Sequence, residues 1–271
     1  GRDKIYAVEE PGYSKIRKIY AAGGVVCVSA PMDDQGVLPA SLNAADVLHC
    51  SPSHHFPSGL VTPVGRRVEL LNWAKQGKWI IEDDYDSEFR FDSHPKPAMQ
   101  ALDGAGRVIY MNTFSKSLAP SIRISYLVLP EALMADFKRK LGFYSCTVAS
   151  FEQYTLARFL SRGHFEKHIN RMRKFYRQRR NTVVSLLENC AFSRQLTILE
   201  QDAGLHFLLK VNTLLPDRQL TQALEQAGIR IRALSDYYHD SRRDLHCLVV
   251  NYSGIKEEDL SRALEALERI L

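Results

Sequence analysis

Short apolar runs alternate with helix-like segments through the first half of the sequence, and this alternation limits the fold more than any other feature. The runs at residues 24–29, 46–50 and 78–82 are short and rich in β-branched side chains, so they predict buried strands. Amphipathic patterns over residues 14–22, after a serine cap, and 63–76 predict helices between them. Because strands that alternate with helices form mostly parallel sheets covered by helices, we expect an α/β fold.

Polar, loop-forming segments follow three of the predicted strands. Residues 51–59 hold two prolines, a glycine and two adjacent histidines, whereas residues 83–92 are acidic and aromatic. Residues 112–123 are rich in small and hydroxyl side chains and have Lys116 near their centre. Ligands of such sheets bind at the carboxyl ends of the strands. We therefore expect the three loops to converge on one site.

Lys116 lies between two further apolar runs, at residues 106–111 and 124–129, which both predict buried strands. A lysine at the mouth of two buried strands is expected to be partly desolvated. Desolvation disfavours the ammonium form, and such a lysine can attack a carbonyl to form a Schiff base. The alternative is a lysine on an exposed turn formed by serine and proline, and for a lysine considered alone that alternative is the commoner case.

The pattern changes after residue 130, where long helical segments replace the alternation. A second series of strands and helices then follows, at residues 196–199, 205–211, 216–227, 229–232, 245–251 and 256–271. We predict a large α/β domain over residues 1–150. Residues 151–271 are predicted to form linking helices, interrupted near Gly163, and a smaller α/β domain.

The run at residues 171–180 is strongly basic and allows two interpretations. It is either a face that binds nucleic acid or another anion, or a solvated helix with Met172, Phe175 and Tyr176 turned inward, which we prefer. The net charge of +5 decides little, because 36 basic residues are interleaved with 31 acidic ones. The first interpretation predicts steeply salt-dependent DNA binding.

Several classes of protein are disfavoured by the remaining features. The five cysteines are odd in number and widely spaced, which predicts neither a disulfide framework nor a metal site. Neither a bilayer-spanning apolar stretch nor a secretory signal is recognisable, so we predict a cytoplasmic protein.

Asp83 and Tyr85 follow the strand at residues 78–82 and supply, with Lys116, the groups that a pyridine cofactor needs. A carboxylate that faces the ring nitrogen keeps it protonated, so that the ring withdraws electrons from the substrate carbon. A phenol beside the ring hydroxyl tunes the Schiff base. Hydroxyls and a guanidinium suited to a phosphate are supplied by Thr113, Ser115 and Arg123.

A family resemblance is carried by four motifs. Residues 112–130 read NTFSKSLAPSIRISYLVLP and closely resemble the pyridoxal-phosphate lysine segment of fold-type I aminotransferases. Residues 82–91, EDDYDSEFRF, resemble the version found in the MocR family, which comprises bacterial regulators of the GntR class with an aminotransferase-like effector domain. Residues 9–13, EEPGY, and 51–59, SPSHHFPSG, are also similar to that family. The resemblance covers nearly the whole chain.

The resemblance implies a role for each matching residue. Lys116 would hold pyridoxal phosphate as an internal aldimine, Asp83 would face the pyridine nitrogen, and Tyr85 would face the ring hydroxyl. The phosphate ligands would be Thr113, Ser115 and Arg123, with His55 or its neighbour His54 near the ring. The implied fold is that of fold-type I aminotransferases, with a mostly parallel sheet and a smaller C-terminal domain.

Two features depart from the family pattern. A small-residue loop that helps to bind phosphate, and a winged helix-turn-helix domain before it, lie upstream of the EEPGY motif in family members, which predicts that this chain is truncated at its N-terminus. The arginine that binds the substrate carboxylate in aminotransferases is absent from residues 248–254. Arg230 and Arg232 are the candidates instead, and on an alternating strand only one of them can face the site.

The resemblance implies a ligand sensor: an amine captured by pyridoxal phosphate on Lys116 would shift the two domains and change how the absent DNA-binding domain holds an operator. Candidate effectors are an amino acid, a γ-amino acid such as GABA, or pyridoxal phosphate itself. The alternative is a working aminotransferase, in which the released Lys116 is the general base for proton transfer. Either protein is expected to be a homodimer.

Overall fold

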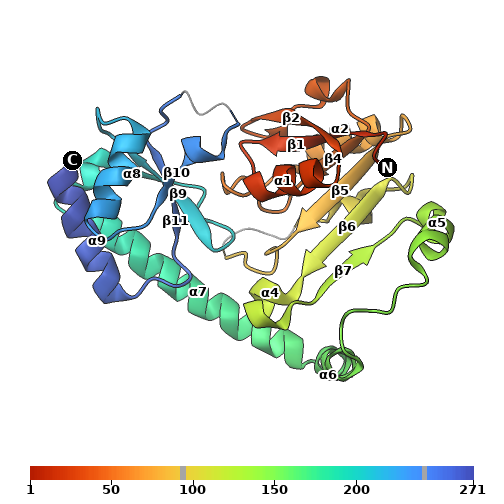
Figure 1. Ribbon diagram of the computed structural model, residues 1–271. Helices are drawn as coiled ribbons and strands as arrows, with labels where there is room; N and C mark the ends of the chain where they lie inside the picture. The colour runs from red at the N-terminus through yellow and green to blue at the C-terminus, as the bar shows by residue number, and fades with distance from the viewer. Residues whose placement is uncertain (92–95, 240–242) are drawn as a thin grey trace.

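The computed structural model describes residues 1–91, 96–239 and 243–271 and divides into two sheet-containing units (Figure 1). The N-terminal unit is built on a seven-stranded sheet, and the C-terminal unit on a four-stranded sheet. The long helix α7 (His164–Asn189) runs below both units. The domain boundary near residue 150 stays a prediction.

The seven-stranded sheet is mostly parallel, which confirms the predicted α/β class. Its strand order is β3-β2-β1-β4-β5-β6-β7. The parallel strands are β1 (Ile5–Glu10), β2 (Val26–Asp33), β4 (Val47–Cys50), β5 (Trp79–Asp84) and β6 (Val108–Thr113). The short β3 (Gly36–Val37) and β7 (Ser125–Val128) pair antiparallel at the two edges. The carboxyl ends of the parallel strands therefore meet along one edge.

Helices cover this sheet, and α2 (Val64–Ala74) shows why its sequence is helical. Its apolar positions Leu70, Leu71 and Ala74 recur at helical spacing and are buried in the core against the sheet. The other helical segments of this unit are α1 (Ser14–Ala22), η1 (Pro39–Leu42), α3 (Met99–Leu102), α4 (Phe114–Ser117), η2 (Pro120–Ile122) and α5 (Glu131–Leu141). The predicted serine cap of α1 is wrong, because Tyr13 precedes the helix and its side chain makes no capping hydrogen bond.

The strand after Lys116 differs from its prediction. β7 was expected to be buried, but all four of its residues are exposed. It is the last strand in the sheet order and pairs only with β6, so its apolar side chains have sheet on one side only. Lys116 itself lies on the short helix α4 rather than in an extended loop.

The C-terminal unit has the predicted order of strands and helices, with one exception. Its sheet order is β10-β11-β9-β8, and every pair is antiparallel. After α6 (Ser150–Ser161) and α7 come η3 (Ser193–Gln195), β8 (Leu196–Leu199), β9 (His206–Val211), α8 (Asp217–Gln226), β10 (Arg232–Ala233), η4 (Leu234–Tyr237), β11 (Cys247–Asn251) and α9 (Glu257–Ile270). The exception is the strand predicted at residues 229–232, of which only Arg232 lies in β10. Residues 229–231 do not pair with β11.

Three arginines in the basic run of α7, residues 171–180, donate hydrogen bonds to backbone carbonyls elsewhere in the protein. Arg173 donates to the carbonyl of Glu88 and Arg177 to that of Phe91, so these two guanidinium groups tie the helix to the N-terminal unit. Arg179 donates to the carbonyl of Ile255 in the C-terminal unit, 2.9 Å from Nε. Because these arginines bond to the protein's own backbone, the contacts support the interpretation of the basic run as part of a structural helix rather than as a nucleic-acid-binding face.

The inward side of α7 was predicted correctly at two of three positions. Met172 and Tyr176 pack against the C-terminal core. Phe175 does not turn inward, because its side chain is 48% exposed.

Within the described ranges, no helix is long and apolar enough to cross a membrane. The five cysteines are free: Cys50 and Cys247 are buried, Cys27 and Cys190 are half-buried, and Cys146 is exposed. No cluster of metal-ligating side chains occurs in this described part of the chain.

Candidate functional site

The three polar loops meet at the carboxyl edge of the large sheet, as predicted. In the parallel register His49 on β4 pairs with Ile81, and Asp83 on β5 pairs with Met111 on β6. Lys116 follows β6 directly, at the same edge. The C-terminal unit closes over this edge, where Nε2–H of His206 on β9 donates a hydrogen bond to the carbonyl of Pro57, 3.2 Å away.

Asp83 is held by a histidine and a tyrosine that sequence reasoning missed. The Nε2 atom of His49 lies 3.5 Å from Oδ2 of Asp83, and its Nδ1 lies 2.7 Å from the hydroxyl of Tyr20. A carboxylate only accepts, so Nε2–H donates to Asp83, and in the neutral ring Nδ1 accepts from Tyr20. Burial raises the pKa of Tyr20, which keeps this phenol protonated as the donor. The one available signal was a lone polar residue in the otherwise apolar strand β4.

Tyr85 is packed between acidic and imidazole groups. Its hydroxyl lies 3.2 Å from Nδ1 of His54, and the same Nδ1 lies 2.9 Å from a carboxylate oxygen of Asp86. Burial, followed by the charge on Asp86, raises the pKa of Tyr85 well above its ordinary value. Tyr85 is therefore a protonated phenol that can donate a hydrogen bond to a ligand at this edge.

Gly204 allows the C-terminal unit to approach His54. A Cβ atom at this position would lie 1.7 Å from Cε1 of His54, and the backbone has a φ of +69°. Any other residue would both clash with the imidazole and strain the backbone. The close approach brings His206 of the C-terminal unit to His54, with ring centroids 4.6 Å apart.

The His55 side chain is buried away from solvent. The histidine that contacts Asp83 is His49, not His55. Nδ1 of His55 lies 2.6 Å from the hydroxyl of Ser58, and its Nε2 lies 3.6 Å from a carboxylate oxygen of Glu9. Burial, with a contribution from His54, lowers the pKa of His55 to about 3, so the ring is neutral. Its predicted place near a cofactor ring stays a prediction.

Glu9 is a buried acid at the end of β1. Its Oε2 accepts a hydrogen bond of 3.0 Å from the backbone N–H of Ser51. Burial, with a smaller contribution from the negative charge of Asp83, raises the pKa of Glu9 from 4.5 to about 8. Glu9 is therefore a neutral, protonated acid at neutral pH and adds no negative charge to this part of the site.

Replacing Glu9 by glutamine is expected to reduce the fall in the free energy of unfolding that the wild type shows as pH rises toward 8. Between about pH 4.5 and pH 8 the unfolded chain releases the Glu9 proton while the folded chain keeps it. The free energy of unfolding therefore falls as pH rises, by up to about 1.4 kcal/mol per pH unit from this group. Urea unfolding at pH 7 and pH 8 should show a smaller decrease for Glu9→Gln than for the wild type. Equal decreases would contradict the assigned protonation.

The residues predicted to bind a phosphate lie together. Oγ1 of Thr113 is 2.8 Å from Oγ of Ser115, and a guanidinium nitrogen of Arg123 is 3.5 Å from the same Oγ. Thr113 caps α4 by accepting from the backbone N–H of Ser115, and Arg123 has a left-handed φ of 51°. Two hydroxyls and a guanidinium within this distance fit the oxygen atoms of a single phosphate.

Lys116 stands beside this group, and its side chain is exposed. The expectation that two buried strands desolvate it is wrong for this chain, because β7 is an exposed edge strand. Lys116 nevertheless faces the site. Burial and then His54 lower the pKa of His206, and the charge on Lys116 adds to this effect. An amine at this position is accessible to a carbonyl compound bound beside Asp83.

Arg230 and Arg232 are both exposed and border a cavity of the C-terminal unit together with Phe56. The expected alternation does not apply, because only Arg232 belongs to a strand. Their predicted contact with a substrate carboxylate stays a prediction.

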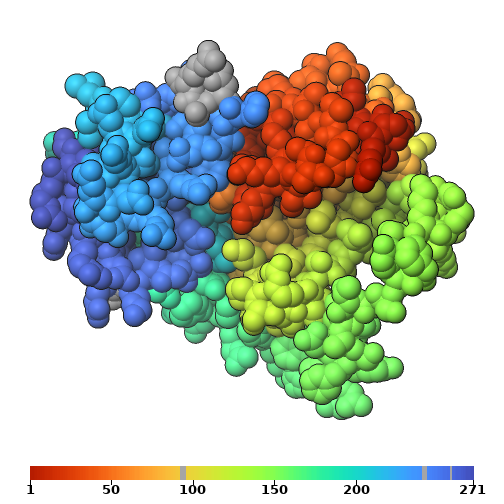
Figure 2. All heavy atoms as spheres, viewed as in Figure 1, coloured from red at the N-terminus to blue at the C-terminus, as the bar shows by residue number. Residues whose placement is uncertain are grey.

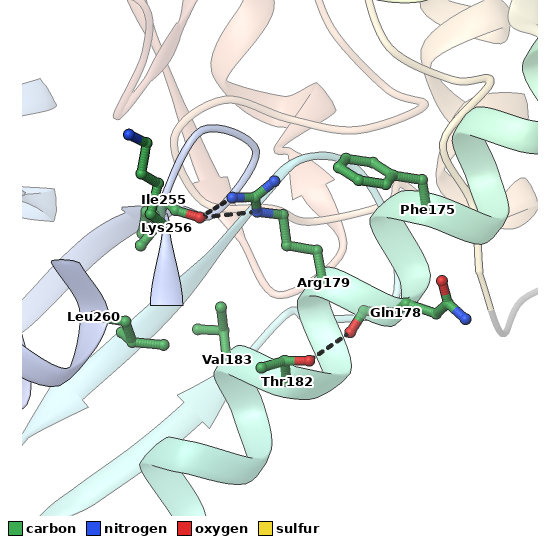
Figure 3. A pocket seen from close by; sticks show the side chains of 8 residues that line it. All are labelled: Phe175, Gln178, Arg179, Thr182, Val183, Ile255, Lys256 and Leu260. Atoms are coloured by element: carbon green, nitrogen blue, oxygen red, sulfur yellow. Dashed lines mark hydrogen bonds between the residues drawn. The ribbon is translucent and has the colours of Figure 1, made fainter. Parts of the chain in front are cut away.

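A smaller pocket, of about 260 Å³, lies away from the sheet edge, between α7 and the start of α9 (Figure 3). Arg179 crosses it to donate to the carbonyl of Ile255, and Thr182 donates to the carbonyl of Gln178. The side chains of Arg179 and Thr182 thus already have hydrogen-bond partners within the protein, and we assign this pocket no ligand.

Residues 2–267 match the family described as Aminotransferase class I and II. The chain is 33% identical over 264 residues to the probable rhizopine catabolism regulatory protein MocR of Rhizobium meliloti, covering 96% of this chain and 53% of that protein. It is 36% identical to the uncharacterized HTH-type transcriptional regulator YdeL of Bacillus subtilis, covering 96% of this chain and 56% of YdeL. The chain thus spans about half the length of the curated relatives it matches.

Solved structures share the fold at low sequence identity. Pyrococcus horikoshii kynurenine aminotransferase superposes with a TM-score of 0.81 at 24% identity, covering 99% of this chain and 70% of that one. An archaeal alanine:glyoxylate aminotransferase superposes with a TM-score of 0.83 at 22% identity, covering 98% and 68%. These similarities establish a fold-type I aminotransferase architecture.

Proposed function

The chain belongs to the class I and II aminotransferase family and resembles, within it, the aminotransferase-like part of MocR-type HTH regulators; from this premise we propose that it senses an amino compound through pyridoxal phosphate held by Lys116. The cofactor of this family is pyridoxal phosphate. When bound, it supplies an electron-withdrawing pyridine ring and a carbonyl carbon that reacts with amines.

The protein side chains would bind and orient this cofactor. The Lys116 amine would attach it, and Asp83, oriented by the hydrogen bond from His49, would hold the proton on the pyridine nitrogen. The Tyr85 hydroxyl would donate to the ring hydroxyl. Thr113, Ser115 and Arg123 would bind the phosphate, which their mutual distances of 2.8 and 3.5 Å support.

One observation carries the proposal: an oriented carboxylate, a phosphate-sized cluster of donors and Lys116 all lie at the carboxyl ends of two neighbouring strands. Asp83 lies at the end of β5, and the donors follow β6, its neighbour in the sheet. A pyridine ring with a phosphate on one side needs a carboxylate and an anion site with a lysine between them, and this edge supplies all three.

A regulatory role rests on the relatives, several of which are named as HTH-type transcriptional regulators. We propose that operator DNA is bound by another part of a longer protein and that binding of the amine changes how that part is held. An amino acid, a γ-amino acid or pyridoxal phosphate itself remain the candidate effectors.

We also propose that the protein pairs as a homodimer. Aromatic side chains are exposed in the segment after α5 and in α6, including Phe143 at 75% and Phe151 at 80%. Figure 2 shows this segment, in green, standing out from the body of the molecule. Such a concentration of exposed aromatic residues supports contact with a second protein surface.

Replacing Asp83 by asparagine is expected to weaken binding of pyridoxal phosphate by about 10- to 100-fold, because a charge-assisted hydrogen bond to the pyridine nitrogen is lost. Titration of the cofactor, followed by absorbance, measures the change. Asp84→Asn is the matched control. Asp84 is the next residue of the same strand, but its Oδ2 accepts from Tyr110 and Ser87 on the other face of the sheet. Equal affinities for Asp83→Asn and the wild type would contradict the proposed role.

A working aminotransferase is the second candidate, favoured by the family match itself. In that case the released Lys116 amine would move a proton as the general base. Incubation with an amino donor and a keto acid distinguishes the two functions. Many turnovers per site would establish the enzyme, whereas a spectral change on binding an amine without turnover would support the sensor.

A further inference from the structure

A cavity of about 610 Å³ lies in the C-terminal unit, between strand β11 and the helices α7, α8 and α9. Pockets that hold small molecules typically measure about 300–1,000 Å³. The cavity is separate from the edge that carries Lys116, which does not line it. Its size is that of a ligand site rather than of a packing defect.

The walls of this cavity are apolar and belong to the core of the unit. Leu224 of α8, Leu248 of β11 and Leu260 of α9 all line it, and they are 2%, 1% and 6% exposed. Ala263 of α9 also lines it. Walls of this kind accept a hydrocarbon chain or ring, because burial in them removes apolar surface from water.

The mouth of the cavity is cationic. Arg230 lines it from the segment that precedes β10, and Arg232 lines it from the first position of β10; both are exposed. Among residues 1–91, 96–239 and 243–271, neither guanidinium forms an ion pair with a carboxylate, whereas Arg262, which also lines the cavity, is paired with Asp259. A planar guanidinium binds a carboxylate through two parallel hydrogen bonds.

The mouth stays open because of the local backbone. Only Arg232 and Ala233 pair with β11, opposite Val249 and Leu248. Residues 229–231 leave the sheet, so the edge of β11 beyond Val249 is not covered by a neighbouring strand. Arg230 thus stands beside the apolar interior outside the sheet, next to Arg232 at the start of β10.

We propose that this cavity is a second ligand site, which binds an amphipathic monocarboxylate with its hydrocarbon part among the leucines and its carboxylate on Arg230 and Arg232. The site goes beyond amine sensing at Lys116, because it requires neither the cofactor nor an amine. The wall it shares with the N-terminal unit is Phe56, whose ring lies 5.2 Å from that of His206.

Decanoate is the probe, and binding is measured by calorimetry on the cofactor-free chain, below the concentration at which the probe forms micelles. Decanoate should bind at least about tenfold more tightly than decanol, because decanol cannot form a charged hydrogen bond with the guanidinium groups. Acetate should not bind measurably, because it lacks the hydrocarbon part.

Two variants test the two halves of the site. Arg230→Gln combined with Arg232→Gln should weaken decanoate about tenfold or more and leave decanol unchanged. Ala263→Phe should fill the cavity and abolish binding of both. Arg218→Gln is the matched control, since Arg218 is an exposed arginine of α8 that does not line the cavity.

The outcomes separate this site from the proposed cofactor site. Lys116→Ala should bind decanoate as the wild type does, and loss of binding in that variant would place decanoate at the cofactor site and overturn the inference. Equal affinity for decanoate and decanol, or undiminished binding by a folded Ala263→Phe variant, would also overturn it. Absence of decanoate binding with an intact lysine-dependent cofactor spectrum would refute this inference alone.

Discussion

Lys116→Ala is expected to abolish the visible absorbance band that pyridoxal phosphate acquires when it attaches to a protein lysine. Lys116 lies on α4 next to the Thr113–Ser115 hydroxyl pair, at the sheet edge where β5 ends in Asp83, so we expect no other amine to replace it. The cofactor is added to purified protein, unbound cofactor is removed, and the spectrum is recorded. Reduction with borohydride followed by mass spectrometry of peptides should place the adduct on Lys116 in the wild type and on no residue in the variant.

Lys138→Ala is the control for this experiment. Lys138 is an exposed lysine of α5, and its replacement should leave the spectrum unchanged. A band of full intensity in Lys116→Ala would refute the assignment of the lysine and, with it, the proposed cofactor site.

Arg67→Met is expected to be the most destabilising single substitution in the N-terminal unit, by about 3–5 kcal/mol. The Arg67 side chain is fully buried on α2, and its guanidinium lies 3.9 Å from the equally buried carboxylate of Glu82. It also donates to the carbonyls of Thr62, Pro52 and Pro97. Methionine fills the volume but leaves a buried carboxylate and three carbonyl oxygens without these donors.

Unfolding in urea measures the loss, with Lys75→Met at the exposed end of the same helix as the control. The deficit should be larger at pH 8 than at pH 5. Burial raises the pKa of Glu82, and the pKa should rise further without the opposing charge of Arg67. At pH 8 the unfolded chain has an ionised Glu82, whereas the folded variant must either keep the proton or bury an unpaired charge, so folding is least favourable there. Adding Glu82→Gln to Arg67→Met should recover part of the stability. A deficit below about 1 kcal/mol for the single variant would contradict a structural role for this ion pair.

Features that depend on local sequence were predictable. Apolar runs and amphipathic patterns gave the strands and helices of both units, because period and length are properties of a segment of some ten residues. The carboxyl-edge convergence of the three loops followed from strand alternation alone. Lys116, Asp83 and the hydroxyl cluster were identified because each directly follows a recognisable strand.

Features that depend on contacts between distant segments were not predictable. His49 and Tyr20 are 29 residues apart, and nothing in either segment indicates that they meet beside Asp83. The exposure of β7 could not be read from its apolar sequence, because it depends on the position of the strand at the sheet edge. The partners of the basic residues in α7 are carbonyl groups some 76 to 86 positions away.

The sequence by itself determined the α/β class and the resemblance to regulators that contain an aminotransferase-like part, and it predicted Lys116 as the cofactor lysine, with its carboxylate, phenol and phosphate donors. These are carried by short motifs whose chemistry is written in adjacent residues. Tertiary structure alone decided which histidine orients Asp83, that Lys116 is exposed, and that Arg230 and Arg232 stand at the mouth of an apolar cavity. Burial, ion pairing and cavities arise from packing between segments, and packing is decided only when the whole chain has folded.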